Sequence, residues 1–475
     1  MHEVEEESFR DAISTVEQTG KRAWLYPKKP KGPYTNWRKY VAFFLITVLF
    51  AAPFIHINGH QFLLFNFFER QFHILGQPFW PQDFHLVVLL MIIGVVFVSV
   101  FTIAYGRIFC GWICPQTIFL EMLFRPLEYW IEGDRNAQIR LNKQPWNASK
   151  IRKKVFKWGL YFLISLAISA VFMSYILGSG SVMEQLGNPS KHVSTFVFWL
   201  IFSSVFYFVF AWFREQVCII ACPYGRLQGV LLDQNTVVVA YDHIRGEKQK
   251  GRSKINRKED RASSGKGDCI DCKLCVDVCP TGIDIRNGTQ LECVNCTACI
   301  DACNEVMEKV KFKPHLIKYA SLREIKHRDS KRWTTRLKAY TATLVFLLGI
   351  FVFFVLNRSY VETDFFRLPG QLYTVDKQTN SLQNVFTFKI LNKSTEPLNA
   401  LDFKLINIAD GKIYAVNKQN INLAAEEILD GTVFVELPLK TWQGRPKKLQ
   451  IGIYQNNTLI DKAKIRFIGP RKYTK

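Results

Sequence analysis

Residues 269–280 read CIDCKLCVDVCP, and residues 293–304 read CVNCTACIDACN. Each run has the spacing C-x2-C-x2-C-x3-C, in which three closely spaced thiolates can hold three corners of an iron–sulfur cubane. The fourth corner then comes from the last cysteine of the other run. The spacing therefore predicts two [4Fe–4S] clusters in an inserted, bacterial-type ferredoxin-like α+β domain. The predicted ligands are Cys269, Cys272, Cys275 and Cys303 for the first cluster, and Cys293, Cys296, Cys299 and Cys279 for the second.

Zinc is the alternative group for cysteines at such close spacing. Structural zinc sites use separated C-x2-C pairs rather than three cysteines plus one, so the spacing favours clusters. All 12 cysteines lie between Cys110 and Cys303, in basic segments that we expect to face a reducing cytoplasm. That location favours metal or redox roles over disulfides.

Five apolar runs outside this segment have the length of membrane spans. They cover residues 38–58, 84–105, 156–178, 193–213 and 337–357, with few or no charges at their centres. A run of about 20 apolar residues crosses the hydrocarbon core of a bilayer as one helix. The sequence therefore predicts a multi-domain membrane protein with five transmembrane α-helices.

Lysine and arginine flank these runs unevenly, and the chain has a formal net charge of +22. They are dense in residues 21–39, 106–155 and 214–336, whereas 59–83 and 179–192 carry one each. By the positive-inside rule, the dense segments are cytoplasmic and the C-terminal domain is periplasmic. The expected location is the bacterial cytoplasmic (inner) membrane. No aromatic-rich nucleic-acid motif accompanies the basic residues, so the expected partner is membrane lipid and not nucleic acid.

The C-terminal part of the chain has a different texture. Alternating stretches such as VFTFKIL (385–391) and TVFVELPL (432–439) are separated by turn residues at intervals of about ten. This pattern predicts an immunoglobulin-like β-sandwich, interpreted as a docking module. Residues 61–75 and 115–131 are amphipathic, and we expect them to lie on the outer and inner membrane surfaces.

These patterns together predict five parts. They are a cytoplasmic N-terminal segment (1–36), a four-helix membrane domain (37–235), a cytoplasmic ferredoxin-like domain with basic flanks (236–336), a fifth membrane helix (337–357) and a periplasmic β-sandwich (358–475).

The other four cysteines form a repeated C-x3-C-P motif. It reads CGWICP at 110–115 and CIIACP at 218–223, each time after a predicted membrane hairpin. The i, i+4 spacing places both sulfurs on one helix face. Proline disfavours helix in the residue before it, so each second cysteine should end one helix while proline opens the next. Because helix N-termini lower thiol pKa values, we expect thiolates here.

The chemistry of this repeat has three readings. Four soft thiolates suit Cu(I), a dithiol relay could carry electrons, and small buried cysteines could simply pack. Repetition with the same trailing proline favours a functional role. The candidate catalytic residues, as copper ligands or electron relay, are Cys110, Cys114, Cys218 and Cys222.

Histidines gather near the expected outer face, at His56, His60, His73 and His85. They could bind a metal or a quinone head group, although scattered histidines at a membrane interface usually have no such role. Methionine is scarce, with six in the chain, so the sequence has no methionine-rich copper funnel.

With these motifs the chain resembles the FixG/CcoG cytochrome c oxidase accessory proteins. The resemblance rests on FWPQDF (79–84), GRIFCGWICPQT (106–117), REQVCIIACPYGRLQ (214–228), the double ferredoxin run and the β-rich tail. It implies a membrane protein that assists maturation of cbb3-type cytochrome oxidase by reducing Cu(II) to Cu(I), with the C-x3-C-P cysteines binding copper or relaying electrons. It also implies oxidase assembly factors or copper carriers as partners.

Three functions follow from this reading. The first is a cupric reductase that serves oxidase assembly. The second is a quinol dehydrogenase subunit of a periplasmic reductase system, and the third is a redox-sensing assembly scaffold. The large C-terminal sandwich favours the first, because a simple quinol-oxidising subunit has no evident need for it. The sequence leaves open whether quinol is the electron donor and whether the chain forms a homodimer.

Overall fold

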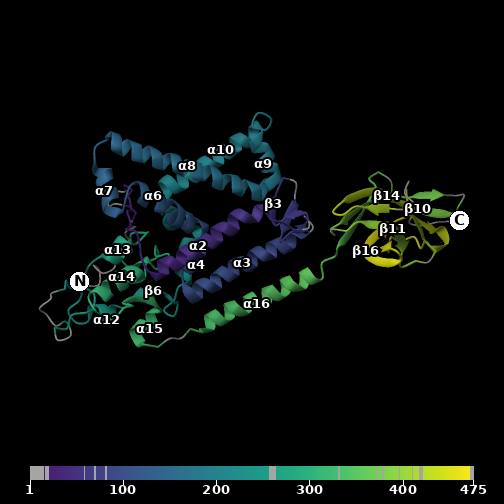
Figure 1. The fold of residues 1–475 in the computed structure, drawn as a ribbon. Coiled ribbons are helices and arrows are strands. Elements are labelled where there is room, and N and C mark those ends of the chain that lie inside the picture. The colour runs from purple at the N-terminus through teal and green to yellow at the C-terminus, as the bar shows by residue number, and fades with distance from the viewer. Residues whose placement is uncertain are drawn as a thin grey trace. The chain divides into compact units, whose positions relative to one another are not determined.

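The structure is a computed structural model. It describes residues 15–16, 21–57, 59–68, 71–80, 83–255, 261, 264–329, 332–370, 372–376, 379–394, 396–408, 410–416 and 421–470. The chain forms two compact units (Figure 1). The larger unit comprises residues 1–57, 61–76 and 85–351, and the smaller one comprises 58–60, 77–84 and 352–475.

Within the described residues, five helices are long and apolar enough to cross a membrane. They are α2 Pro33–Ala51 with its 3-10 extension η1 Ala52–Phe54, α3 Phe84–Tyr105, α8 Ala148–Leu177, α10 Val193–Phe208 with its π-helical extension η4 Val209–Phe213, and α16 Thr335–Leu356. Each of the five predicted spans therefore contains one of these helices, although the helix of the first ends at Phe54, before strand β1 His56–Ile57. Helix α8 begins well before its apolar run, because Asn147 caps it by accepting a hydrogen bond from the backbone amide of Lys150.

Helices α8 and α10 lie side by side, joined through α9 Ser179–Gly187 (Figure 1). Serines at their contact allow close approach, and the hydroxyls of Ser169 and Ser203 are hydrogen-bonded at 2.5 Å. Near the other end of α8, Tyr161 packs edge-on against Phe124 and donates a hydrogen bond to its carbonyl. This packing ties the hairpin to the helical segment after the first C-x3-C-P motif.

Short helices follow each C-x3-C-P motif. The first motif lies on α4 Ile108–Trp112 and leads into α5 Pro115–Ile118, η3 Phe119–Phe124, α6 Arg125–Ile131 and α7 Arg135–Lys143. The second lies on η5 Val217–Ala221 and leads into α11 Pro223–Leu231. The amphipathic segment 115–131 is thus helical, and its apolar side is buried with Phe119 and Phe124 at 2% and 0% exposure.

The other amphipathic segment, 61–75, contains strands. Strand β3 Leu63–Asn66 pairs with β4 Gln71–Ile74 in antiparallel register, with Leu64 opposite His73. The neighbouring short strands are β1 His56–Ile57, β2 His60–Gln61 and β5 Gln77–Phe79. The side chain of Gln61 donates to the carbonyl of Ser174 on α8, at 2.9 Å.

The ferredoxin-like segment belongs to the larger unit. Strand β6 Val238–Tyr241 pairs antiparallel with β7 Ile317–Ala320. Its helices are α12 His243–Glu247, α13 Leu274–Asp277, η6 Ile285–Asn287, α14 Ala298–Lys309 and α15 Leu322–His327.

A carboxylate of this segment caps the first membrane helix. Asp301, on α14, accepts hydrogen bonds from the backbone amides of Tyr34 and Thr35 and from the Thr35 hydroxyl. These amides are in the first turn of α2, where no partner exists within the helix. Gly32 leaves room for the contact, because a Cβ there would lie 2.4 Å from Asp301.

The smaller unit contains the predicted β-sandwich. One sheet has the order β12-β14-β10-β8, with β9 pairing β10, and the other has the order β13-β11-β15-β16. The strands are β8 Val361–Arg367, β9 Thr374–Asp376, β10 Ser381–Asn392, β11 Leu398–Leu405, β12 Lys412–Ala415, β13 Ile421–Leu423, β14 Ile428–Pro438, β15 Lys447–Gln455 and β16 Thr458–Phe467, with the 3-10 turn η7 Leu439–Thr441 after β14. Alternate residues such as Ile390, Val433 and Ile451 are fully buried between the sheets.

A buried ion-pair network ties residue 83 to the sandwich within the smaller unit. Asp83 pairs with Lys393 at 2.8 Å and with Arg358 at 2.7 Å, and Lys393 also reaches Glu362 at 2.7 Å. The side chains of Asp83 and Lys393 are each only 4% exposed. Burial alone would raise the pKa of Asp83, but hydrogen bonds and charge from Lys393 and Arg358 hold it below its ordinary value.

Replacing Asp83 by Asn should destabilise the sandwich. Removing one partner of a buried pair leaves the ammonium of Lys393 poorly compensated, and we expect a loss of about 3 kcal/mol. Pulse proteolysis of the intact protein in a urea series measures this loss. Asp364→Asn, at an exposed position of β8, is the matched control, and equal losses in both variants would contradict the network's role.

Candidate functional site

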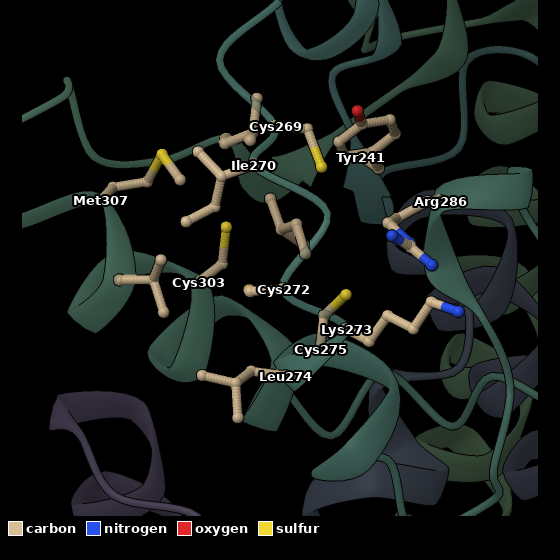
Figure 2. Close-up of a pocket in the computed structure, with 13 residues that line it drawn as sticks. Tyr241, Cys269, Ile270, Cys272, Lys273, Leu274, Cys275, Arg286, Cys303 and Met307 are labelled. Atoms are coloured by element: carbon tan, nitrogen blue, oxygen red, sulfur yellow. The ribbon is translucent and has the colours of Figure 1, made fainter. Parts of the chain in front are cut away.

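Four of the predicted cluster cysteines line one cavity. Cys269, Cys272, Cys275 and Cys303 border it together with Tyr241 and Arg286. Figure 2 shows the sulfurs of Cys269, Cys275 and Cys303 turned towards the space between them. We call this space the first cluster cavity.

The remaining four line a second cavity next to it. Cys279, Cys293, Cys296 and Cys299 border this second cluster cavity, and Cys275 contributes to the walls of both. The two cavities enclose similar volumes, about 370 and 340 Å³. The structure therefore groups the cysteines across the two runs, as the ferredoxin spacing predicts.

The same backbone device shapes both cysteine loops. Residues on either side of the second cysteine of each run take positive φ angles, at Asp271 and Lys273 (51° and 58°) and at Asn295 and Thr297 (53° and 65°). Such left-handed residues bend the chain sharply. Each loop therefore turns its cysteines inwards around one space.

The donor set of these cavities fits iron–sulfur clusters. All the cysteines are free thiols, and four thiolates per site is the usual ligand set of a [4Fe–4S] cluster. Across the described residues, no three Cys, His, Asp or Glu side chains gather closely enough to hold a single metal ion. Sulfurs spaced around a cavity suit a polynuclear group better than one zinc ion, whose four ligands lie within about 2.3 Å of it.

Burial favours the neutral form of several of these thiols. It raises the pKa of Cys275, Cys293 and Cys303 to about 12. Because a thiol must lose its proton to bind iron, cluster insertion releases protons from this site.

The structure brings the two C-x3-C-P motifs together. Cys110 lies on α4 and Cys218 on η5, whereas Cys114 and Cys222 are the N-cap residues of α5 and α11, with proline at the first helical position. The prediction that proline opens a new helix is confirmed. The pKa of Cys218 is affected by the charges of Cys110, Cys114 and Cys222, and that of Cys110 by Cys114 and Cys222. We call these four cysteines the four-thiol group.

The expectation of thiolates is wrong for Cys110, Cys114 and Cys218, whose pKa values are raised above the ordinary value in the protein without copper. Burial raises the pKa of Cys110 to about 11 and that of Cys218 to about 12. At Cys114, burial raises the pKa more than the backbone amides of Thr117 and Gln116 lower it. A helix N-terminus favours the anion, but here desolvation is the larger effect.

The four-thiol group adjoins the second cluster cavity. Cys110 packs against a buried cluster of ferredoxin-like residues that includes Val294 and Cys296. The guanidinium of Arg38 donates to the carbonyl of Gly111 at 2.8 Å and to that of Cys296 at 3.4 Å, so one side chain joins the two sites.

A buried ionic network that we did not predict supports this junction. Arg214 pairs with Glu128 through two hydrogen bonds of 2.9 Å, and Glu215 pairs with Arg125. Arg125 also donates to the carbonyl of Pro280, next to a cluster cysteine. Two lysines of α8 extend the network. Lys154 and Lys157 both pair with Glu132, which directly follows α6, and Lys157 also pairs with Glu128. The helical spacing of the acidic residues in 115–131 was the signal that could have found this network.

The four histidines do not form a metal site. Across the described residues no group of three metal-binding side chains includes them. The Nε2 of His60 lies 2.6 Å from a carboxylate oxygen of Glu426 instead.

Family models match three parts of the chain. Residues 213–322 match a 4Fe-4S dicluster domain, residues 85–137 match a 4Fe-4S binding domain, and residues 351–470 match the IG-like fold at the C-terminal of FixG. The second of these segments holds Cys110 and Cys114 of the four-thiol group.

Several curated proteins are similar over long stretches. Protein RdxB of Cereibacter sphaeroides is 34% identical over 395 residues, which cover 79% of this chain and 80% of that protein. Nitrogen fixation protein FixG of Rhizobium meliloti is 37% identical over 307 residues, 64% of this chain and 58% of that one. A crystal structure of a FixG-related protein from Vibrio parahaemolyticus aligns with 23% of this chain and 97% of its own, at 22% identity and a TM-score of 0.19.

Apolar helices, ferredoxin-type cysteine cavities and the matching iron–sulfur domains define a membrane-bound iron–sulfur electron-transfer protein. Its immunoglobulin-like C-terminal domain separates it from simple ferredoxins. The chain belongs to the FixG family, together with RdxA and RdxB.

The contact between α4 and the cluster loop depends on Gly111. A Cβ at this position would lie 2.4 Å from the carbonyl oxygen of Val294, which is backbone and cannot move aside. Gly111→Ala should therefore destabilise the junction by about 3 kcal/mol and alter one of two cluster signals in electron paramagnetic resonance. Gly94→Ala, with nothing within 4 Å, is the control. An unchanged spectrum of the first variant would contradict the contact.

Acid should weaken the fold through Glu128. Burial alone would raise its pKa, but the charges of Arg214, Lys157 and Arg125 lower it from 4.5 to about 2. Because the folded-state pKa lies below the unfolded value, this stabilisation is complete above pH 4.5 and disappears as the pH falls to 2. The loss attributable to this group is about 3 kcal/mol. Urea unfolding at a series of pH values measures the free energy of unfolding. Between pH 4.5 and pH 2 this free energy should fall by about 3 kcal/mol less in Glu128→Gln than in the wild type. An equal fall in both proteins would refute the assignment.

Proposed function

We propose that this chain reduces Cu(II) to Cu(I) and so assists assembly of a cbb3-type cytochrome c oxidase. The observation that carries the proposal is the contact of the four-thiol group with the wall of the second cluster cavity, made by Cys110 and the Arg38 bridge. A set of soft donors beside a ferredoxin-type site can hold copper and receive single electrons from that site.

The proposed cluster ligands are the two sets of four cysteines that line the cavities. Bound there, the clusters supply one-electron storage and transfer. The protein encloses the two cluster cavities, lines them with cysteine sulfurs and places Arg286 at the wall of the first. The guanidinium of Arg286 pairs with Asp284 and Asp271 and lowers the pKa of Cys275 against the effect of burial.

Copper is the substrate of the four-thiol group in this proposal. Because no three metal-binding side chains of the described residues already stand close enough to hold one ion, the thiols must draw together as copper binds. Cu(II) binds as thiol protons pass to water, gains one electron and becomes Cu(I). Thiolate prefers Cu(I) to Cu(II), so the same ligands that receive the ion stabilise its reduced form.

We place the ferredoxin-like segment in the cytoplasm and the sandwich in the periplasm. The distribution of Lys and Arg around the five apolar helices supports this orientation. The sandwich, as an immunoglobulin-like domain without cysteine, then provides a docking surface for a copper carrier or an oxidase assembly factor.

Cuprous ion should appear when the reduced protein meets Cu(II). The full chain, reduced under anaerobic conditions and freed of reductant, is mixed with Cu(II) and a Cu(I)-specific chelator, and colour formation is followed. Double replacement Cys110→Ser and Cys222→Ser should lower the initial rate by about tenfold or more, because the hard hydroxyl is a poor ligand for Cu(I).

The cluster content of the same samples is the control. Iron, acid-labile sulfide and both paramagnetic signals should be unchanged in the double variant, whereas Cys279→Ser should change one signal. Copper reduction that persists in the double variant would refute the site. Iron in excess of two clusters, lost from the double variant, would assign the four-thiol group to a third cluster instead.

A further inference from the structure

A third cavity lies where helices α3 and α16 meet the ferredoxin-like segment of the larger unit. It encloses about 1,010 Å³, part of it open to solvent. One side is apolar, formed by residues of α3 and α16 such as Phe101, Ile103 and Leu337, and the other is polar, with Asp233, Asn235 and Arg332. We call it the interfacial cavity. Its two-sided lining fits an amphiphile with a compact polar head and an apolar tail.

The polar side holds an acceptor that lacks a donor. The side-chain oxygen of Asn235 is buried and has no hydrogen-bond partner within the described part of the chain. Next to it, Oδ1 of Asp233 accepts the amides of Asn235 and Thr236 and so fixes the turn. A buried carbonyl oxygen without a partner is costly. Asn235 lines the cavity, and its amide group, turned towards that space, would find a donor in a ligand hydroxyl.

Strand β6 and the residue before it connect this cavity to both cluster cavities. Val237 lines the interfacial cavity, Val239 the second cluster cavity and Tyr241 the first. Successive residues of a strand are about 3.3 Å apart, so the first two positions are separated by about 7 Å. A hydrogen bond from Asn295 of the cluster loop to the carbonyl of Tyr105 makes a second connection.

We propose that the interfacial cavity binds a membrane quinol, which is the electron donor of the chain. The hydroxyls donate to Asn235 and Asp233, and the isoprenoid tail lies along α3 and α16. The carboxylate of Asp233 disfavours a lipid phosphate at the same place. Oxidation of the quinol to quinone releases two electrons, taken up singly by the iron–sulfur centres, and two protons, which pass to Asp233 and water.

This inference rests on the electron-transfer part of the proposed function and names its donor. The full chain in detergent is irradiated with an azido-quinone, and the labelled peptides are identified. Label should fall on the segments around residues 100–105, 233–237 and 332–341. The extent of labelling should fall about tenfold in two variants. Thr341→Trp fills the cavity, and Asn235→Leu removes the acceptor. Ser204→Trp, in a lipid-facing hollow of α10, is the matched control and should keep its label.

A second readout separates this inference from the copper proposal. A short-chain quinol should reduce the clusters in the wild type and in Ser204→Trp, and about tenfold more slowly in Thr341→Trp, whereas dithionite should reduce all of them alike. Unchanged labelling in Thr341→Trp overturns the quinol site, as does labelling that anionic phospholipid displaces and unlabelled quinone does not. Copper reduction after dithionite treatment would remain intact in either case.

Discussion

The two-pronged ion pair between Arg214 and Glu128 is the interaction on which both cysteine sites depend. Arg214 has a positive φ angle, at 52°, and lies four residues before Cys218, the first residue of the second C-x3-C-P motif. Its partner stands on the helix that follows the first motif. Removing one member of such a pair costs about 3–5 kcal/mol, because the remaining charge is buried without compensation. Since Arg125 extends the same network to the carbonyl of Pro280, one set of charges holds the two thiol motifs and the cluster loop in register.

This arrangement explains why the membrane helices and the ferredoxin-like segment form one compact unit. Electron exchange requires the redox groups to stay close, and a flexible tether would not ensure that. Three features hold the sites close together instead. They are the close backbone contact at Gly111, the Arg38 bridge, and strand β6 with the residue before it, which borders the interfacial cavity and both cluster cavities. The sandwich needs no such closeness, which is consistent with its separate core.

Much of the fold and half of the site could be predicted from the sequence. Apolar runs and cysteine spacing are local patterns, so the five helices and the cross-run grouping of Cys279 and Cys303 could be read from them. The contact of Cys110 with the cluster loop could not be predicted, because no local pattern encodes a contact between segments so far apart in the sequence. The protonation of Cys114 was misjudged for a related reason: the helix terminus is visible in the sequence, whereas the depth of burial is set by the tertiary fold. Strands β3 and β4 were not predicted, because each is only four residues long and so short an alternation of apolar and polar residues is not distinctive.

The capping of α2 by Asp301 has a consequence for biogenesis. The ribosome makes the first membrane helix long before the carboxylate that completes it, since the two are separated by 266 positions along the chain. During synthesis the amides of Tyr34 and Thr35 must therefore be solvated by water or lipid headgroups. The N-terminus of α2 receives its carboxylate cap only after α14 has folded. Helix α14 also carries Cys299 and Cys303, so maturation of the iron–sulfur segment is coupled to the final capping of α2. A protease that cleaves near residues 34 and 35 could therefore distinguish mature from immature molecules.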